Sequence, residues 1–437
     1  MPVVVTLLVS LLAVRAARAE SRREPQDYGG PKPSSTGPAL LWVPRIVLFP
    51  PWLVSEYVIR QPVGLVVRSA DKYQWPAAVV QFFTFGERHQ LQIFPSALFD
   101  FGLKPSVGFN LNWKYFLSDP NTLSVHAGTW GPDWIAVRAR DQYDLDDAQA
   151  ISFDASLVNR KDLPFYGIGP SSPQTPRRRY QALTTELALG YHARFWRSSA
   201  LGTRVGMRSL GFGDGTCCGS QSVQDAVNAG TVPAPPGLGQ GYIAEFQGFT
   251  LAIDSRRPRP DNGTGFRTEV HGEAVLAPSR EQAPRRAWAT WGGTAGFAID
   301  TWNSRVVGLS VSADFADPFK GTIPFTDQVS LGGNRPMRGY LQGRLIDRSS
   351  VVATLQYTWP VWVYLNGVIQ TDVGNVFGAH LDGFDFDLLR LSSGIGVRSN
   401  GSPDSGLEVL FAAATDPFNE GFHVASFRLV FGSHHGF

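Results

Sequence analysis

The sequence predicts an all-β protein, a sixteen-stranded antiparallel β-barrel that crosses the outer membrane. Three observations lead to this prediction. Segments in which apolar and polar residues alternate recur along the 437-residue chain. An apolar export signal opens the chain, but no later run of about 18 apolar residues could form a membrane-spanning helix. Between these segments, long and short connections follow one another, which is the pattern of outer-membrane barrels.

Residues 1–19 are predicted to be a signal peptide. Residues 2–14 are almost all apolar, and Ala17 and Ala19 flank Arg18 in a small-residue cleavage site. This apolar core is too short to span a membrane, so we expect cleavage near Ala19. An exported chain without a spanning helix is either a soluble domain or a barrel, because only helices and closed barrels pair every backbone polar group in lipid.

Residues 20–38 are polar and rich in Pro, Gly and Ser, which predicts a disordered linker. Residues 39–75 are predicted to be a short periplasmic helical segment, interrupted at Pro62. Its apolar residues lie on one side, so the segment either packs, over the periplasmic mouth of the barrel or at the inner membrane surface, or docks a periplasmic partner. The general preference of such faces for packing favours the first alternative. The barrel is expected over residues 76–437.

The alternation also indicates which strand faces line the barrel. Arg267, Glu269, His271 and Glu273 share one face of a segment whose other face is mostly apolar. Four charged or titratable residues on one face fit a wet lumen or an exposed sheet face, not a dry core. Eleven strands are expected before residue 316 and five after residue 350. Their ranges are 91–101, 106–116, 122–130, 134–141, 149–157, 180–196, 201–212, 242–254, 266–276, 288–301, 305–315, 351–359, 365–374, 389–397, 406–414 and 424–431.

The gap lengths orient this barrel. If the N-terminus is periplasmic, the outer connections include 158–179, 213–241, 277–287, 316–350 and 375–387. The periplasmic connections are shorter on the whole, namely 117–121, 197–200, 255–265, 302–304, 360–364 and 398–405. Long loops outside and short turns inside are typical of outer-membrane barrels.

Composition and motifs exclude several other classes. The formal net charge of +2 gives no electrostatic case for a nucleic-acid partner. Cys217 and Cys218 are adjacent, so they cannot link distant parts of the chain, and they form either a pinned turn or two free thiols. The usual metalloprotease, serine-hydrolase and phosphate-loop motifs are absent from the sequence. We therefore expect no enzyme activity and no catalytic, cofactor-binding or metal site, and we interpret His434 and His435 as solvated tail residues.

A polar motif interrupts the strand pattern between residues 331 and 347. On the strand that follows, the alternation points Asp372 into the lumen, and the chain ends in Phe437. Together these features resemble the BamA/TamA superfamily of outer-membrane barrels, also called the bacterial surface antigen family. Residues 165–169, Phe-Tyr-Gly-Ile-Gly, are a further match. The residues that carry the resemblance are Gly332, Gly333, Arg338, Gly339, Tyr340, Asp347, Asp372, Gly374 and Phe437.

The resemblance implies specific contacts for this motif. Residues 316–350 should fold back into the lumen, and Arg338 should form an ion pair with Asp372, bidentate if the geometry allows. Gly339 should permit a tight turn at the loop tip, and the hydroxyl of Tyr340 should find a partner in the lumen. Asp347 should brace the base of the loop. Such a buried pair fixes a conformation and is not catalytic.

The resemblance also implies a compartment and a function. It predicts a protein of the bacterial outer membrane that acts in the assembly and insertion of outer-membrane proteins or in protein translocation. The implied partners are outer-membrane lipids, a protein client, and the barrel-assembly machinery, which would read Phe437 during biogenesis. Residues 20–90 are too few for the periplasmic POTRA domains with which relatives capture substrate, so we expect a member without them. The alternative is a transport pore or a structural barrel without a client.

Overall fold

The computed structural model describes residues 81–98, 103–173, 175, 177–215, 217–256, 263–279, 284–302, 305–362, 365–399 and 406–434, with Tyr57, Ser69, Tyr73 and Ala78 as isolated positions. The predicted signal peptide, the linker, nearly all of the helical segment 39–75 and Phe437 lie outside the described residues. Within the part of the chain that is described, no helix has the length and apolar character needed to cross a membrane.

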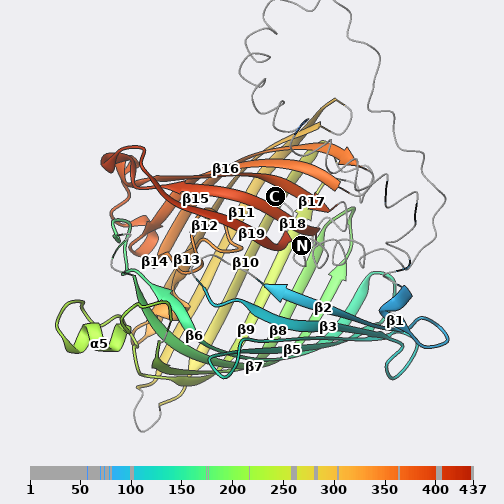
Figure 1. Cartoon of the computed structure of the whole chain (residues 1–437), viewed down its shortest axis with the longest axis horizontal. Helices are drawn as coiled ribbons and strands as arrows, with labels where there is room; N and C mark the ends of the chain where they lie inside the picture. The colour runs from blue at the N-terminus through green and yellow to red at the C-terminus, as the bar shows by residue number, and fades with distance from the viewer. Residues whose placement is uncertain are drawn as a thin grey trace, which may run out of the picture.

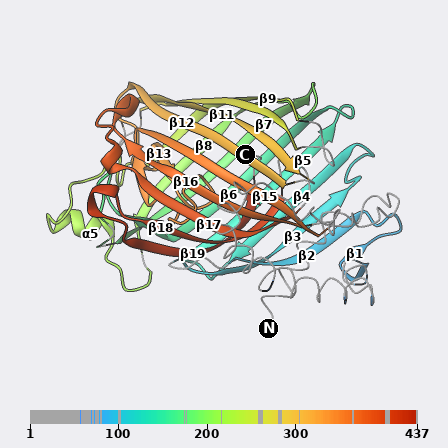
Figure 2. The same ribbon diagram turned by 90° about the horizontal axis from the view of Figure 1, so that it is seen from above.

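A single large antiparallel sheet, wound into a barrel shape, forms the fold (Figures 1 and 2). Eleven long strands precede the long interior loop and five follow it, which confirms the predicted number and division. They are β2 (Leu91–Leu98), β3 (Ser106–Lys114), β4 (Asn121–Thr129), β5 (Trp134–Asp144), β6 (Gln149–Phe165), β7 (Arg178–Arg194), β8 (Ala200–Asp214), β9 (Tyr242–Asp254), β10 (Gly265–Ala277), β11 (Arg286–Trp302) and β12 (Arg305–Lys320), then β15 (Ser349–Trp362), β16 (Leu365–Phe377), β17 (Arg390–Ser399), β18 (Gly406–Thr415) and β19 (Val424–His434).

Each of these strands pairs with its neighbour in sequence, and β12 pairs with β15 across the interior loop. A two-residue strand that the sequence did not predict, β1 (Thr84–Phe85), pairs with the beginning of β2. The curl of the sheet brings β2 and β19 next to each other (Figures 1 and 2). Among the described residues, no residue-by-residue register joins these two strands.

The two faces of the sheet differ as the alternation predicted. Large apolar side chains are exposed on the outside, among them Phe153, Leu187, Val270, Leu309, Leu355 and Phe427. The inner face carries charged groups: Arg208 contacts Glu273 at 2.9 Å and Glu186 at 2.8 Å. An apolar exterior with a polar, ion-paired interior fits a barrel in lipid.

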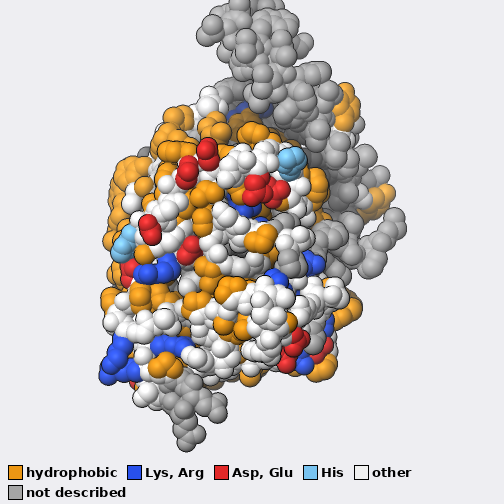
Figure 3. Space-filling model, turned by 90° about the vertical axis from the view of Figure 1, so that its left-hand side faces the viewer, with side chains coloured by type: hydrophobic (Ala, Val, Ile, Leu, Met, Phe, Trp, Pro, Cys, Tyr) orange, Lys and Arg blue, Asp and Glu red, His pale blue; other side chains and the backbone are white. Residues whose placement is uncertain are grey.

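The longer connections gather at the end of the barrel drawn on the left in Figure 1. One of them, residues 215–241, contains the short helix α5 (Val223–Asn228), which the sequence did not predict. Its Val223 packs against Phe165 and Phe325. Figure 3 shows this end of the barrel from outside, and described side chains fill its surface.

Several strand limits differ from the prediction, most clearly on either side of the interior loop and at the end of β6. Strand β12 stays paired with β11 as far as Lys320, and β15 begins at Ser349, so the interior loop is 321–348 and not 316–350. Strand β6 continues to Phe165, well beyond the expected end at residue 157. In both places the backbone pairing continues beyond the part of the strand that needs an apolar face. The alternation of apolar and polar residues ends earlier, so it underestimates the length of the strand.

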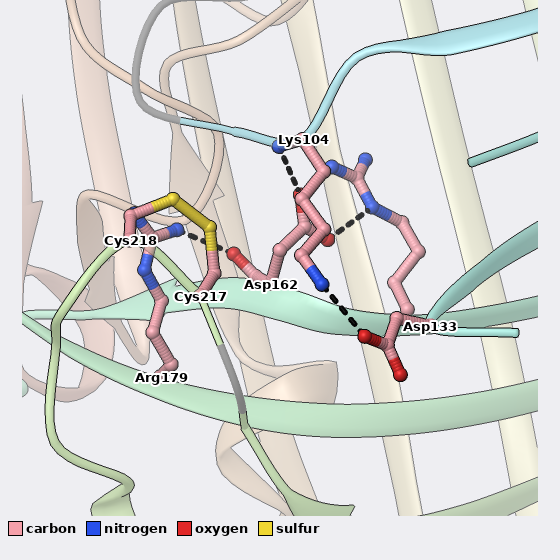
Figure 4. Close-up of a disulfide and its surroundings, with 7 residues drawn as sticks. Lys104, Asp133, Asp162, Arg179, Cys217 and Cys218 are labelled. Atoms are coloured by element: carbon pink, nitrogen blue, oxygen red, sulfur yellow. Dashed lines mark hydrogen bonds and ion pairs between the residues drawn. A yellow bond between two sulfur atoms is a disulfide. The ribbon is translucent and has the colours of Figure 1, made fainter. Parts of the chain in front are cut away.

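Cys217 and Cys218 are joined by a disulfide, so they are not two free thiols. The pair lies beside a group of charged residues on neighbouring strands (Figure 4). There the guanidinium of Arg179 donates to the carbonyl oxygen of Asp162, and the backbone amide of Lys104 donates to the Asp162 carboxylate at 2.8 Å. The connection 215–241 itself is held to β7 by the backbone amide of Arg179, which donates to the carbonyl oxygen of Gln221 at 3.0 Å.

Candidate functional site

The interior loop 321–348 is the candidate functional site. It begins with a 3-10 turn, η3 (Phe325–Asp327), and its two limbs pair as β13 (Val329–Leu331) and β14 (Leu345–Asp347). Its apolar side chains pack on the inner face of the barrel in a buried cluster of Leu331, Met337, Tyr340, Leu345, Val352, Val376 and Ala414. The last three belong to β15, β16 and β18, so the loop lies folded inside the barrel.

The backbone of the loop tip is held by polar side chains from three strands. The amide of Met337 donates to Asp372 on β16 at 2.9 Å, and the amide of Gly339 donates to Ser392 on β17 at 2.9 Å. The hydroxyl of Ser426 on β19 donates to the carbonyl oxygen of Gly339 at 2.6 Å. Backbone groups of a loop need partners when they are buried, and here the barrel wall supplies them.

Arg428 on β19 gathers the carbonyl groups of the same tip. Its Nη1 lies 2.6 Å from the carbonyl oxygen of Tyr340, 3.0 Å from that of Arg338 and 3.3 Å from that of Gly333. Arg428 is buried. Hydrogen bonds from a charged donor are stronger than neutral ones, so one side chain fixes three points of the loop.

Arg338 pairs with Glu408 on β18, and the ion pairs found among the described residues do not include the predicted one between Arg338 and Asp372. Glu408 also contacts Arg398 on β17, with its Oε2 2.6 Å from Nη2. Burial lowers the pKa of Arg338, and the nearby Asp372 carboxylate opposes that shift. Asp372 is in the predicted place, but its oxygens accept from Met337, Thr354 and Gln370. The alternation could place Asp372 in the lumen, but Glu408 shares its inward orientation, and sequence spacing does not rank the two.

The glycines of the motif serve two different purposes. Gly332 and Gly333 have φ values of 95° and 71°, a conformation that favours glycine. Gly339 is not in that region, so the predicted tight turn does not explain it. A Cβ on Gly339 would lie 2.5 Å from the carbonyl oxygen of Ala413 on β18. Glycine is required there because the loop tip lies directly against the barrel wall.

The remaining motif residues lie around the loop and the adjacent strands. The hydroxyl of Tyr340 donates to the carbonyl oxygen of Thr415, at the end of β18, and Tyr340 is fully buried. Asp347 pairs through its backbone with Val329, and its carboxylate accepts from the amide of Arg348 at 2.7 Å. Gly374 leaves room for the neighbouring strand, since a Cβ there would lie 2.3 Å from the carbonyl oxygen of Val351.

The base of the loop contacts the segment after β6, which contains the predicted match at residues 165–169. The amide of Gly169 donates to the carbonyl oxygen of Ile346 at 3.0 Å. Arg344 donates to the hydroxyl of Ser172 at 2.7 Å and lies over the ring of Tyr166, with 4.7 Å to the centroid. Burial and the neighbouring Arg390 lower the pKa of Arg344 to about 10. Arg344 was not predicted as an anchor, because its partner Ser172 is 172 residues away.

A second anchor at the beginning of the loop was also not predicted. The hydroxyl of Tyr242 on β9 donates to Asp327 at 2.6 Å, and Arg208 on β8 lies 3.9 Å from the same carboxylate. Burial raises the pKa of Asp327 despite these two partners. The loop is therefore fixed at its start to β8 and β9 and at its tip to β16–β19.

The contacts of this site hold the interior loop in place, and we refer to them together as the lock. Its contacts are ion pairs, hydrogen bonds to backbone groups and apolar packing, all of which select one loop conformation. Within the described ranges, no group of three or more His, Cys, Asp or Glu residues could hold a metal ion.

Comparisons with known proteins show what this chain is similar to. Residues 264–424, which include β11–β18 and the whole interior loop, match the Omp85 superfamily domain. A search of curated proteins finds no match to the chain. BamA from Haemophilus ducreyi lacking POTRA domains 1–3 is similar in structure, with a TM-score of 0.54 and 13% identity over 79% of this chain and 70% of that one. CdiB from Acinetobacter baumannii gives a TM-score of 0.46 and 10% identity over 78% of this chain and 59% of that one. The part of the chain that contains the interior loop is therefore similar in sequence to the Omp85 superfamily domain, and the fold is similar to that of BamA.

Proposed function

We propose that this protein resides in the bacterial outer membrane and acts there in the insertion of other outer-membrane proteins. The proposal extends the function implied by the superfamily to this chain. Its partners would be membrane lipids and a client polypeptide that arrives from the periplasmic side. The client itself would be a strand-forming membrane protein, since a sheet recognises such a chain by pairing with it.

One observation carries this proposal: the contacts that hold the interior loop extend to β19. This strand lies next to β2, where the two ends of the sheet meet, and we call this junction the seam. Ser426 and Arg428 of β19 both bind the loop tip. Among the described residues, β19 has no register with β2, so the seam is the place where the sheet could admit another strand. A displacement of β19 would pull on the loop, and a displacement of the loop would release β19.

The same lock argues against the alternative of a transport pore. Met337, Tyr340 and Leu345 are fully buried in one apolar cluster, and Phe325 and Val223 are buried in a second one. A conducting pore requires a continuous aqueous path along the barrel axis. The packing of the loop against β15, β16 and β18 favours a lumen plugged by the loop over an open one.

The test uses vesicles that contain the purified full chain and a urea-denatured, eight-stranded outer-membrane protein as the client. The client's heat-modifiable folded form is measured over time on gels. We expect faster folding than in protein-free vesicles and in vesicles with an unrelated closed barrel. Equal rates in all three would contradict an insertase role. Large steady currents in a planar bilayer would favour the pore instead, and a chain that fractionates away from the outer membrane would contradict the location.

A further inference from the structure

Two connections of the barrel carry phenylalanine side chains that remain exposed. In residues 378–389, between β16 and β17, Phe384 and Phe386 are 39% and 72% exposed. In residues 416–423, between β18 and β19, Phe422 is 76% exposed. All three rings lie beyond the strand ends. Large apolar side chains that are exposed close to one another mark interaction sites.

The two connections form one surface. The amide of Phe418 in the second connection donates to the carbonyl oxygen of Leu389 in the first at 2.9 Å. In the first connection the ring centroids of Phe384 and Phe386 are 5.1 Å apart, and in the second those of Phe418 and Phe422 are 5.5 Å apart. Each connection therefore presents a pair of rings in contact, and a backbone hydrogen bond joins the two connections.

The barrel wall holds the first of these connections in place. The amide of Leu381 donates to the hydroxyl oxygen of Ser349, at the start of β15, at 3.0 Å. The Nε2 atom of His380 lies 3.0 Å from Oδ2 of Asp317 on β12. The rings of this connection are thus exposed although its backbone is anchored. A partner meets a preorganised surface, which lowers the entropy cost of binding.

The charges beside these rings have one sign. Apart from two histidines, every titratable side chain of the two connections is a carboxylate. No Lys or Arg occurs in residues 349–389 or in residues 399–427. The carboxylates are those of Asp382, Asp385, Asp387, Asp416 and Glu420.

Four of these carboxylates are exposed and unpaired. Asp416 is partly buried and lies 4.0 Å from Arg390. The other four are exposed, and within the part of the chain that the structure describes none of them forms an ion pair. Together with the rings they form what we call the acidic aromatic surface, which consists of Asp382, Phe384, Asp385, Phe386, Asp387, Phe418, Glu420 and Phe422.

The basic side chains of the same end lie mostly elsewhere. Figure 3 shows most of the acidic side chains of this end in its upper half and most of the basic ones toward its lower half. An anionic lipid headgroup would be repelled by the acidic aromatic surface. A cationic side chain is attracted both by the carboxylates and by the faces of the aromatic rings.

We propose that the acidic aromatic surface binds a cationic, amphipathic polypeptide segment that approaches from outside the cell. Its Lys and Arg side chains pair with the exposed carboxylates and lie over the rings, and its apolar side chains pack against the rings. Exposed ion pairs contribute little to affinity, so the rings supply most of it and the carboxylates select the charge of the partner. The proposal goes beyond the insertase function and shares with it only the location in the outer membrane.

The probe is a fluorescently labelled synthetic peptide that repeats Lys-Leu-Lys-Phe. Its binding to the full chain in phosphatidylcholine nanodiscs is followed by fluorescence anisotropy, and heat-modifiable migration confirms that each variant is folded. Phe386→Ser is compared with Phe319→Ser, because Phe319 is 70% exposed on β12, outside the acidic aromatic surface. Phe386→Ser should weaken binding about tenfold, since an apolar contact is lost. Phe319→Ser should leave binding unchanged.

The charge is tested with Asp387→Asn and, as the matched control, Asp225→Asn on α5, since both aspartates are exposed. Asp387→Asn should weaken binding about threefold at low salt and have little effect at high salt, because surface ion pairs are weak and screened. Asp225→Asn should change binding at neither salt concentration. A peptide with Glu in place of Lys should not bind.

Three results would overturn the proposal. The first is that the parent does not bind the Lys peptide, or binds the Glu peptide equally well. The second is an equal loss of binding in Phe386→Ser and Phe319→Ser. The third concerns lipid as the occupant: a dye attached to Phe386→Cys should be quenched by iodide in water and not by brominated lipid, and the reverse would show that lipid covers the rings.

Discussion

Arg428, on the last strand of the barrel, donates a hydrogen bond of 2.6 Å to the backbone carbonyl oxygen of Tyr340, at the tip of the interior loop. Both residues are buried. The bond connects the strand at the seam with the part of the loop that fills the lumen. Any rearrangement at the seam must therefore either carry the loop tip with it or break a charged, buried hydrogen bond.

Arg428→Gln should loosen the loop. The change removes a charge-assisted donor to three carbonyl groups, and such a bond contributes about 1.5–3 kcal/mol. The open form of the loop should become roughly 10- to 100-fold more populated. Cleavage of the loop by proteinase K in intact vesicles would measure this. Arg335→Gln is the matched control, because Arg335 is an exposed loop arginine whose guanidinium donates to Ser330. Equal cleavage of both variants would contradict the role of Arg428.

Glu408→Ala should destabilise the barrel more than Arg338→Ala does. Loss of Glu408 leaves Arg338 and Arg398 together without their shared carboxylate, whereas loss of Arg338 leaves Glu408 with Arg398. Breaking a buried ion pair from one side costs about 3–5 kcal/mol. We expect the larger part of that range for Glu408→Ala and clearly less for Arg338→Ala in urea unfolding of the reconstituted barrel.

A double-mutant cycle separates the two acidic partners considered for Arg338. Arg338 and Glu408 should be strongly non-additive, since the same interaction is removed by either change. Arg338→Ala and Asp372→Asn should be coupled less strongly, because Asp372 binds the loop through the amide of Met337 and acts on Arg338 through its nearby charge. Strong coupling of Arg338 with Asp372 and none with Glu408 would support the pairing expected from the resemblance against the one found.

The sequence predicted the sheet better than it predicted the lock. Alternation placed Asp372 and Glu273 on the inner face, and the motif located the loop, because these features depend on local periodicity. It did not identify Glu408 as the partner of Arg338 or Tyr242 as the partner of Asp327, since those pairs are 70 and 85 residues apart. Nor did it predict β1, whose two residues are held by ring packing and not by a periodic pattern.

Gly339→Ala should impair the loop without affecting strand pairing. The added Cβ would lie 2.5 Å from the carbonyl oxygen of Ala413, so the tip must move away from β18 and lose its bonds to Ser392 and Ser426. Overpacking of this kind typically costs about 1–3 kcal/mol. Gly202→Ala in β8 is the control, because nothing lies within 4 Å of its added Cβ. Protection of the loop from proteinase K should fall in the first variant only; equal protection would contradict the close approach.

The anchor at the beginning of the loop should contribute less to stability as the pH rises. Burial raises the folded-state pKa of Asp327 above that of an exposed aspartate, while Tyr242 and Arg208 partly oppose the shift and Glu273 adds to it. A carboxyl group with a raised folded pKa stabilises the fold fully below its unfolded pKa of about 4, and that contribution is lost as the pH rises through the folded value. Asp327→Asn keeps an acceptor for Tyr242 and cannot ionise, so it should remove this component of the pH dependence. The measurement is the thermal midpoint of the parent and the variant from pH 4 to pH 8, with the exposed Asp387→Asn as control. The parent should lose stability relative to Asp327→Asn as the pH increases; a constant difference across this range would show that Asp327 has no raised pKa in the folded protein.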